Sequence, residues 1–354
     1  MPEQESYVVA TAERVFADLA DPQSVIQLRN DSWRAPAWAA LLETGLPLAW
    51  VPEVLGGPDV PLDEGFAILR ASGRVALALP LAEAMLGAWM LAQAGITPPP
   101  EAASIVPSGP HDQILVGRDG RLAGKATCVA IATEIERLAV LVASNEGPHV
   151  ALVRTTDCRI NGRPNLAGEL RASIDFDGVF PLAYAKAPAG LNHAAVLRMG
   201  AAVRAQQIAG ALERMLEISV RYATERIAFG KPIGQFQAVQ HNLAKLGGEV
   251  AASVAAAVSA ADAILHEGLA SDASILEISA AKIRCGQAAE VGAAIAHQVH
   301  GAIGFTDEHV LHRFSLRALS WRDDFGNEVF WSTELGSMVA RVGARGLWPL
   351  LASR

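Results

Sequence analysis

The sequence predicts a mainly α-helical protein with a small β domain placed between two helical regions. Three observations predict this class. Apolar residues recur every three or four positions up to about residue 110 and again after about residue 190, which is the helical period. Between these limits, short runs of period two are separated by turn residues, as strands are. The chain has 354 residues, of which 51% are hydrophobic, so it can fill more than one core.

The first predicted domain, residues 1–110, consists of helices joined by loops rich in Gly and Pro. The stretch Ile96–Pro110 contains three consecutive prolines and is typical of a linker to the next domain. Apolar positions at helical spacing predict helices over four segments: Val8–Leu19, Trp38–Leu42, Leu62–Val75 and Pro80–Ala92.

The second predicted domain, residues 111–190, is a small antiparallel β domain. Turns are expected at Arg118–Gly120, Asn145–Gly147 and Asn161–Gly162, because Asn, Asp and Gly adopt turn conformations easily. Four runs have the composition of strands: Ile114–Gly117, Leu138–Ser144, His149–Thr155 and Ser173–Val179.

The third predicted domain, residues 191–354, is Ala-rich and helical. Within it, Arg221–Gln240 is expected to form the end of one helix, a loop at Phe229–Pro232 and the start of a second helix. The guanidinium of Arg226 is a planar donor that suits phosphate oxygens. Side-chain amides follow it and can pair with the polar edge of an adenine or a flavin: Gln235, Gln237 and Gln240.

This segment resembles the R-x-x-F-G-x-x-I-x-x-F-Q signature of the acyl-CoA dehydrogenase family. Gln298–Thr306 resembles the same family's Q-x-x-G-x-x-G-F motif, and Gly45–Gly57 is similar to its G-L-x-x-x-x-x-P-E-x-x-G-G loop. The order of the three predicted domains also matches. The resemblance implies an N-terminal helical domain, a middle β-barrel domain and a C-terminal four-helix bundle. It further implies FAD as cofactor, α,β-dehydrogenation of an acyl-CoA thioester and transfer of electrons to an external acceptor.

The resemblance also implies roles for single residues in binding FAD across a subunit interface, and therefore an oligomer. Arg226 would contact the pyrophosphate, Phe229 the adenine or ribose, and Gln237 the adenosine end, while Gln298 and Gly301 would line the same FAD. Each residue has an ordinary structural alternative. Arg226 could pair with Glu225 or Glu249 on the surface, the glutamines could be polar helix positions, and Gly301 could only end a helix.

The family's catalytic base has no clear counterpart in this chain. Counting on from Phe305 places Phe325 where the family's Tyr-Glu-Gly-Thr segment has its Glu, with Asn327 in place of the Thr. Asp324 and Glu328 are the nearest carboxylates and are weak candidates for the base. The alternative family position lies near Gly200, where no carboxylate is found.

With these departures the chain resembles the short, base-less subunit of bacterial α2β2 acyl-CoA dehydrogenases that act on steroid side chains. A second dehydrogenase-like subunit is therefore the expected partner. One alternative is a self-sufficient homotetramer with an unusual base. Two others are a non-catalytic scaffold that has lost its flavin and a flavoenzyme that oxidises a substrate without CoA.

Other features narrow the class of protein. The net charge of -8 argues against nucleic-acid binding, and the three cysteines lack metal or disulfide spacing. No secretory signal is visible, and the apolar runs Ala76–Ala92 and Ala251–Leu265 are expected to be buried helices without a membrane span, so a cytoplasmic location is expected. His309 and His312 have metal-compatible spacing, but a solvated helix face is the favoured interpretation, and no metal is expected.

Overall fold

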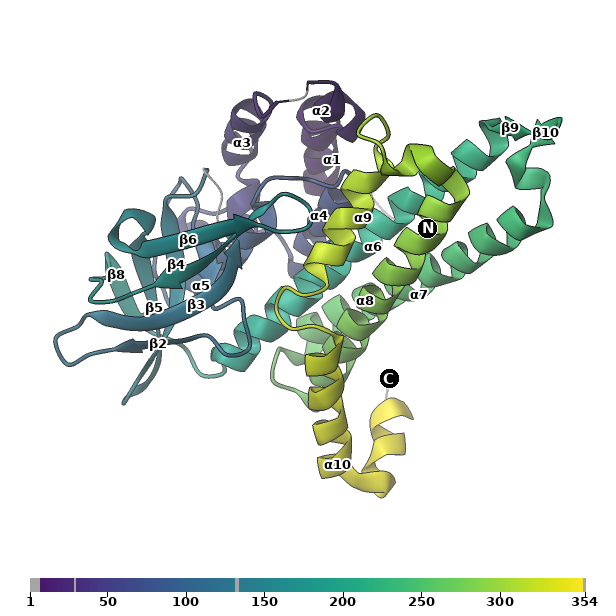
Figure 1. Ribbon diagram of the computed structural model, residues 1–354. Coiled ribbons are helices and arrows are strands. Elements are labelled where there is room, and N and C mark those ends of the chain that lie inside the picture. Colours follow the sequence, from purple (N-terminus) through teal and green to yellow (C-terminus); the bar gives the residue numbers. More distant parts are fainter. Residues whose placement is uncertain (1–6, 29, 131–133, 353–354) are drawn as a thin grey trace.

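The computed structural model describes residues 7–28, 30–130 and 134–352, and its helical, β and helical regions follow one another along the chain as predicted (Figure 1). The predicted N-terminal helices are present, and a further helix, α2, lies between the first two. The Gly/Pro-rich loop between α3 and α4 forms two short 3-10 turns, Leu46–Leu48 and Glu53–Leu55. The helices are α1 (Tyr7–Leu19), α2 (Pro22–Leu28), α3 (Arg34–Glu43), α4 (Leu62–Arg74) and α5 (Leu81–Gln93).

The middle domain is an eight-stranded sheet whose strands follow the order β6-β7-β3-β2-β4-β5-β8, with β1 paired to β4. Its apolar interior forms a core separate from that of the helices. The strands are β1 (Ser104–Val106), β2 (Gln113–Val116), β3 (Leu122–Ala130), β4 (Arg137–Ser144), β5 (Gly147–Arg154), β6 (Arg159–Pro164), β7 (Leu170–Asp175) and β8 (Ala183–Lys186).

Three predictions about the β domain are corrected by the structure. Strand β1 lies inside the predicted linker, so the sheet begins before the expected boundary at residue 111. The domain is not purely antiparallel, because β1 and β2 each pair with β4 in parallel. The expected turn at Asn161–Gly162 lies inside β6. The chain turns later because Asn165 Oδ1 accepts the backbone N–H groups of Ala167 and Glu169 at 2.9 and 3.0 Å.

The C-terminal domain packs long helices side by side around α8, which contacts α6, α7, α9 and α10. Two of them start at side-chain caps, Asn192 on the N–H of Ala195 and Ser271 on the N–H of Ser274, each at 3.0 Å. The helices are α6 (His193–Glu225), α7 (Gln237–Glu267), α8 (Asp272–His300), α9 (Leu311–Trp321) and α10 (Glu328–Ala352), and the loop between α6 and α7 contains β9 (Ile227–Ala228) and β10 (Lys231–Pro232).

Close contact between α4 and α6 joins the two helical regions into one core. Two glycines permit this approach. A Cβ on Gly73 would lie 2.1 Å from the carbonyl oxygen of Gln207, and one on Gly210 would lie 2.0 Å from that of Arg70. Larger residues at these positions would push the helices apart, so both glycines help to place α6 against the N-terminal domain.

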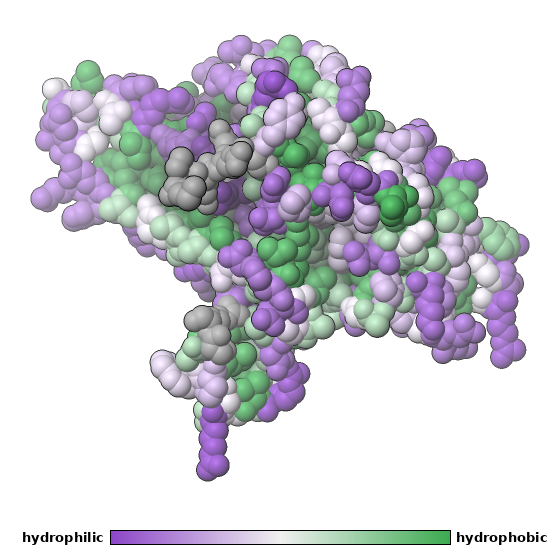
Figure 2. Space-filling model, turned by 180° about the vertical axis from the view of Figure 1, so that it is seen from behind, coloured by the Kyte–Doolittle hydropathy of each residue, from purple (hydrophilic) through white to green (hydrophobic). Residues whose placement is uncertain are grey.

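The outer face of α7 is apolar and largely exposed. Among the described residues, α7 is the one helix long and apolar enough to cross a membrane by length and composition, although such a test also selects helices of soluble bundles. Only 33% of the most apolar 18-residue stretch of α7 is buried. The burial expected for Ala251–Leu265 is therefore found on the inner face of the helix alone. Figure 2 shows the kinked end of α10 standing away from the body of the molecule.

Candidate functional site

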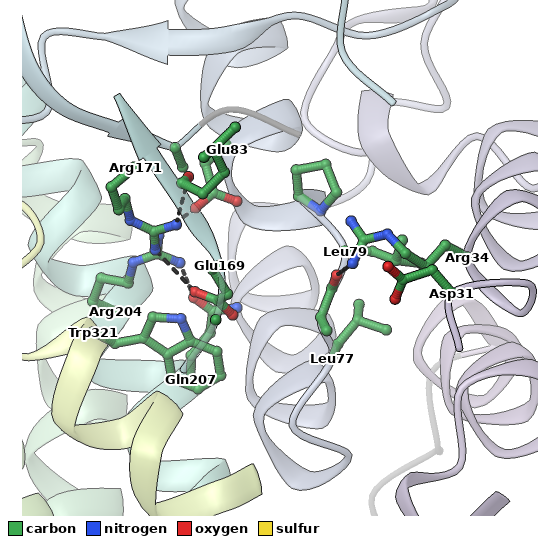
Figure 3. A pocket seen from close by; sticks show the side chains of 15 residues that line it. Asp31, Arg34, Leu77, Leu79, Glu83, Glu169, Arg171, Arg204, Gln207 and Trp321 are labelled. Atoms are coloured by element: carbon green, nitrogen blue, oxygen red, sulfur yellow. Dashed lines mark hydrogen bonds and ion pairs between the residues drawn. The ribbon is translucent and has the colours of Figure 1, made fainter. Parts of the chain in front are cut away.

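A cavity of about 210 Å³ lies where the three regions of the chain meet (Figure 3). The loop before α5 forms one wall with apolar side chains. Buried charged groups from α5, β7 and α6 form the opposite wall, and Figure 3 shows Arg34 and Asp31 across the open space from them. The residues that line the cavity include Arg34, Glu83, Glu169, Arg171, Arg204 and Trp321.

Arg204 is the centre of a buried ion-pair network that connects these elements. Its side chain is 2% exposed and donates to the carboxylate of Glu83 on α5 and to that of Asp324, 2.8 Å away. Asp324 also accepts from Arg171 of β7 at 2.9 Å, and Arg171 is 3.1 Å from Glu169. Every one of these charges therefore has an opposite charge in contact, as burial requires.

The network fixes the ionisation of Asp324. Burial alone would raise the pKa of this carboxyl, but Arg171 and Arg204 outweigh burial and hold the pKa below its ordinary value. A general base that takes a proton from carbon works best with a pKa near the working pH and an open approach to substrate. Asp324 has neither property, and its geometry is that of a counterion.

Glu328 and Lys282 hold the loop that carries Asp324. Glu328 begins α10 and pairs with Arg322 at 2.9 Å. Lys282 of α8 is buried and donates to the backbone carbonyls of Arg322 and Gly326 at 2.5 and 2.8 Å, and its burial lowers the pKa of its amine to about 8. Asn327 Oδ1 accepts the N–H of Phe330 at the start of α10. These contacts give the loop one defined conformation.

Phe325 fills the space between this loop and α6. Its side chain is 2% exposed, and a Cβ on Gly200 would lie 2.3 Å from the Cγ of its ring. The backbone of Phe325 has a φ of 56°, which is costly for an aromatic residue. Phe325 and Gly200, the two positions where the resemblance puts a base, are therefore in contact. The ring of Phe325 fills the space that a side chain at position 200 would need.

The first of the two segments to which the resemblance assigns FAD contacts ends α6 and projects from the end of the bundle; these two are named the flavin-contact segments. Arg226 and Gln237 are exposed, and Phe229 is 94% exposed at the tip of the β9–β10 hairpin. The tip residues Phe229 and Gly230 have φ of 52° and 79°, the pattern of a tight type I′ turn. Among the described residues Arg226 forms no ion pair, and Glu249, one of its two suggested surface partners, contacts Arg284 instead.

The second flavin-contact segment lies beside the first because α6 and α8 run in the same direction. Gln298 is exposed in the last turn of α8, and Gly301 ends the helix with a φ of 64°. The ring of His300, between them, stacks on Tyr222 of α6 with centroids 4.5 Å apart. The structure therefore brings the ends of α6 and α8 together, with Arg226, Gln298 and Gly301 exposed. The surface that carries these three residues is named the flavin-facing surface, after the FAD contacts that the resemblance implies.

The sequence interpretation missed most of the ion-pair network. Of the residues in contact here it named Asp324 alone, as a weak candidate for the base. One signal was present: Glu83 stands alone in an apolar helix, where a charge needs a partner. The expected solvated face at His309 is wrong, because His309 is half-buried with its ring 4.6 Å from that of His300. Within the described ranges, no group of three or more metal-type side chains is arranged to hold an ion.

Comparison with known proteins agrees with this geometry. A family model described as "Acyl-CoA dehydrogenase, C-terminal domain" matches residues 192–326. The chain is 27% identical to acyl-CoA dehydrogenase IpdE2 of Mycobacterium tuberculosis over 90% of this chain and 91% of that protein.

Two solved structures share the fold. One is the ChsE4-ChsE5 complex from Mycobacterium tuberculosis, with a TM-score of 0.83 and 21% identity over 97% of this chain and 100% of that chain. The other is the Tcur3481-Tcur3483 steroid ACAD G363A variant, with a TM-score of 0.81 and 22% identity over 94% and 97%. Motifs, fold and relatives agree, and the chain belongs to the acyl-CoA dehydrogenase family of flavoprotein oxidoreductases.

Proposed function

We propose that this chain is the base-less subunit of an FAD-dependent acyl-CoA dehydrogenase, in which a second dehydrogenase-like chain supplies the catalytic carboxylate. The reaction class of the family is α,β-dehydrogenation: the acyl α-carbon loses a proton to a carboxylate, and the β-carbon loses a hydride to the flavin. The contribution of this chain is to bind and orient the FAD.

The observation that carries the proposal is the ring of Phe325 against Gly200. A carboxylate at either position would face the same space, and the chain has an apolar side chain in one and no side chain in the other. The nearest carboxylate, Asp324, is neutralised by two arginines. Among the described residues, neither of the two positions to which the resemblance assigns the base therefore carries a carboxylate.

The flavin-facing surface supports the second half of the proposal. Arg226 and Gln298 are exposed polar groups without ion pairs within the described parts of the chain, and Gly301 leaves room for close approach of a ligand. Such groups suit the pyrophosphate and adenosine of an FAD whose reactive ring lies in another subunit. We assign Arg226 to the pyrophosphate of FAD, and Phe229 and Gln237 to its adenosine end. Gln298 and Gly301 would line the same FAD.

A partner chain also explains the exposed apolar face of α7. That face lies beyond the first turns of α7, whose exposed residues include Gln237, His241 and Lys245, and an exposed apolar helix face is stable when another chain covers it. Two proteins with the same fold, ChsE4-ChsE5 and Tcur3481-Tcur3483, are pairs of chains, and the second pair is a steroid enzyme. By analogy we propose an α2β2 assembly acting on a steroid-derived acyl-CoA.

The first test is the visible absorption spectrum of the chain purified alone and after co-expression with a neighbouring dehydrogenase-like gene product. We expect flavin bands only in the co-expressed sample. Flavin at near-stoichiometric amount in the isolated chain would instead favour a self-sufficient homo-oligomer. Absence of flavin from both samples would favour a scaffold that has lost the cofactor.

A matched pair of variants then tests the assignment of Arg226. Arg226→Ala should weaken FAD binding by the co-expressed complex roughly tenfold or more, because a charge-assisted contact is lost. Arg214→Ala, which removes an exposed arginine of the same helix, should leave FAD binding unchanged. If Asp324→Asn or Glu328→Gln abolished turnover by a pure homo-oligomer, the partner hypothesis would be wrong.

A further inference from the structure

We propose that His300 is a positioning residue: its ring stack with Tyr222 holds the two flavin-contact segments in register. The inference rests on the proposed function, because it concerns the same flavin-facing surface. The two segments are far apart in the sequence, and each ends a different helix. Their relative position decides whether Arg226 and Gly301 can reach one ligand together.

Tyr222 connects the stack to the first segment. It lies in the last turn of α6, and its backbone carbonyl accepts the N–H of Arg226 at 2.8 Å. Arg226 is therefore one helical turn from the stacked ring and has a backbone hydrogen bond to the residue that carries it. A change in the position of Tyr222 moves the end of α6, and with it the guanidinium that faces solvent.

His300 connects the stack to the second segment. It is the last residue of α8, is 3% exposed, and directly precedes Gly301. The two rings have centroids 4.5 Å apart and an interplanar angle of 27°, a stacked arrangement. Because Gly301 has a positive φ that other residues avoid, the direction in which the chain leaves α8 depends on how its last turn is held.

The stack, and not a hydrogen bond between helices, is what His300 contributes. Its Nδ1 donates to the carbonyl of Ala296 in its own helix at 2.8 Å. That bond leaves a lone pair on Nε2, which is buried and has no hydrogen-bond partner within the described parts of the chain. The ring of His309 packs against it from the turn before α9, with centroids 4.6 Å apart. An aromatic ring is therefore the feature needed at position 300.

Two substitutions at this position separate the stack from simple burial. His300→Phe keeps an aromatic ring, and His300→Leu keeps an apolar side chain of similar size without one. His266 is a matched control, because its Nδ1 makes the same kind of contact with Asp262 of its own helix at 2.8 Å, at the far end of α7. The measurement is the FAD dissociation constant of the co-expressed complex after removal and re-addition of FAD, with the melting temperature recorded for each variant.

We expect His300→Leu to weaken FAD binding roughly five- to tenfold at an unchanged melting temperature, since one aromatic pair is lost. His300→Phe should recover most of that loss, and His266→Leu should bind as the wild type does. Equal affinities of the Leu and Phe variants would overturn the role of the stack. If His300→Leu does not fold, Tyr222→Leu removes the same stack from the other helix and must show the same loss.

A double-mutant cycle adds a second criterion. If Tyr222 and His300 act through one stack, the double Leu variant should bind FAD no more weakly than the weaker single variant. Additive losses would show that the two rings act separately and would overturn the proposal. Failure of the wild-type complex to bind FAD would overturn the proposed function itself, and it is distinguished from the other outcomes because it appears before any substitution is made.

Discussion

Two arginines of the C-terminal domain, Arg226 and Arg204, lie in opposite environments. Arg226, at the end of α6, is exposed and has no ion pair within the described parts of the chain, whereas Arg204, in the middle of the same helix, is 2% exposed and contacts two carboxylates. The first arginine is available to a ligand. The second is neutralised within the fold and connects α5, α6 and the loop that carries Asp324.

The difference indicates which region is free to bind a ligand, as proposed, and which region supports the fold. A ligand that entered the cavity beside Arg204 would have to break ion pairs that burial makes costly to separate. A ligand at the flavin-facing surface breaks none, and it would give Arg226 the anionic partner that it does not find among the described residues. Residues that look alike in sequence therefore differ in function because of what surrounds them.

The largest effect is expected at Arg204. Replacing it by Met keeps the volume but leaves Glu83 and Asp324 buried without their positive partner, so the free energy of unfolding should fall by about 3–5 kcal/mol. Urea unfolding of the purified protein measures this change. Arg214→Met, at an exposed ion pair with Glu217, should change it by less than about 0.5 kcal/mol. Similar small changes for both variants would mean that the buried network does not support the fold.

The next effect is expected at Phe325. Phe325→Ala leaves a cavity beside Gly200 and should lower the free energy of unfolding by about 3 kcal/mol. Phe305→Ala, at a ring that is 71% exposed, should leave stability within about 0.5 kcal/mol of the wild type. Thermal unfolding of the two variants side by side tests whether Phe325 is a packing residue, and equal melting temperatures would contradict it.

A smaller effect of opposite sign is expected at Phe229. Asn accepts the positive φ of this turn position better than Phe, so Phe229→Asn should raise the free energy of unfolding by about 0.5–1 kcal/mol. The same change removes an exposed ring from the flavin-facing surface and should weaken FAD binding about tenfold. Urea unfolding and FAD titration of one preparation measure both. A variant that gains stability and keeps its FAD affinity would remove Phe229 from the binding surface.

An effect of similar size is expected in acid. Burial and the nearby histidines lower the pKa of His309 from 6.5 to about 4. The folded state therefore favours the neutral ring, and this contribution is complete above pH 6.5 and is lost as the pH falls from about 6.5 to about 4. The loss should be on the order of 1 kcal/mol, because solvent reaches part of the ring.

His309→Asn isolates this contribution from the other groups that titrate in acid. Asn cannot take up a proton in this range, and its side chain can keep the contact that His309 Nδ1 makes with the N–H of Leu311 at 3.2 Å. Unfolding measured across this pH range should therefore depend less steeply on pH in the variant than in the wild type. Parallel curves would show that His309 does not titrate with folding.

Local patterns made much of the fold predictable. Helical spacing located α1, α4 and α5, and the Phe-Gly turn correctly separated α6 from α7. Predictions failed where a local signal was weak or competed with another. The sheet begins at Ser104 inside a Pro-rich stretch because β4 offers a partner strand, and Asn161–Gly162 stays extended because the turn forms at Asn165.

The candidate site likewise has residues that local motifs predict and contacts that they do not. Arg226, Phe229, Gln237, Gln298 and Gly301 lie in short motifs at helix ends, so sequence alone could nominate them, and the structure brings the two motif segments to one surface. A count along the chain also placed Phe325 at the position of the base. No pattern could reveal that its ring rests on Gly200, since that contact joins the loop before α10 to α6, more than a hundred residues earlier in the chain.

The sequence by itself determined the family, the helical and β regions and the helix ends that carry the flavin motifs, because these depend on residues close together in the chain. The tertiary structure decided the rest. Glu83, Arg171, Arg204 and Asp324 come from four separate segments, and they become one neutral network only when the three domains pack together. Burial then makes that pairing necessary, since a charge removed from water needs an opposite charge beside it.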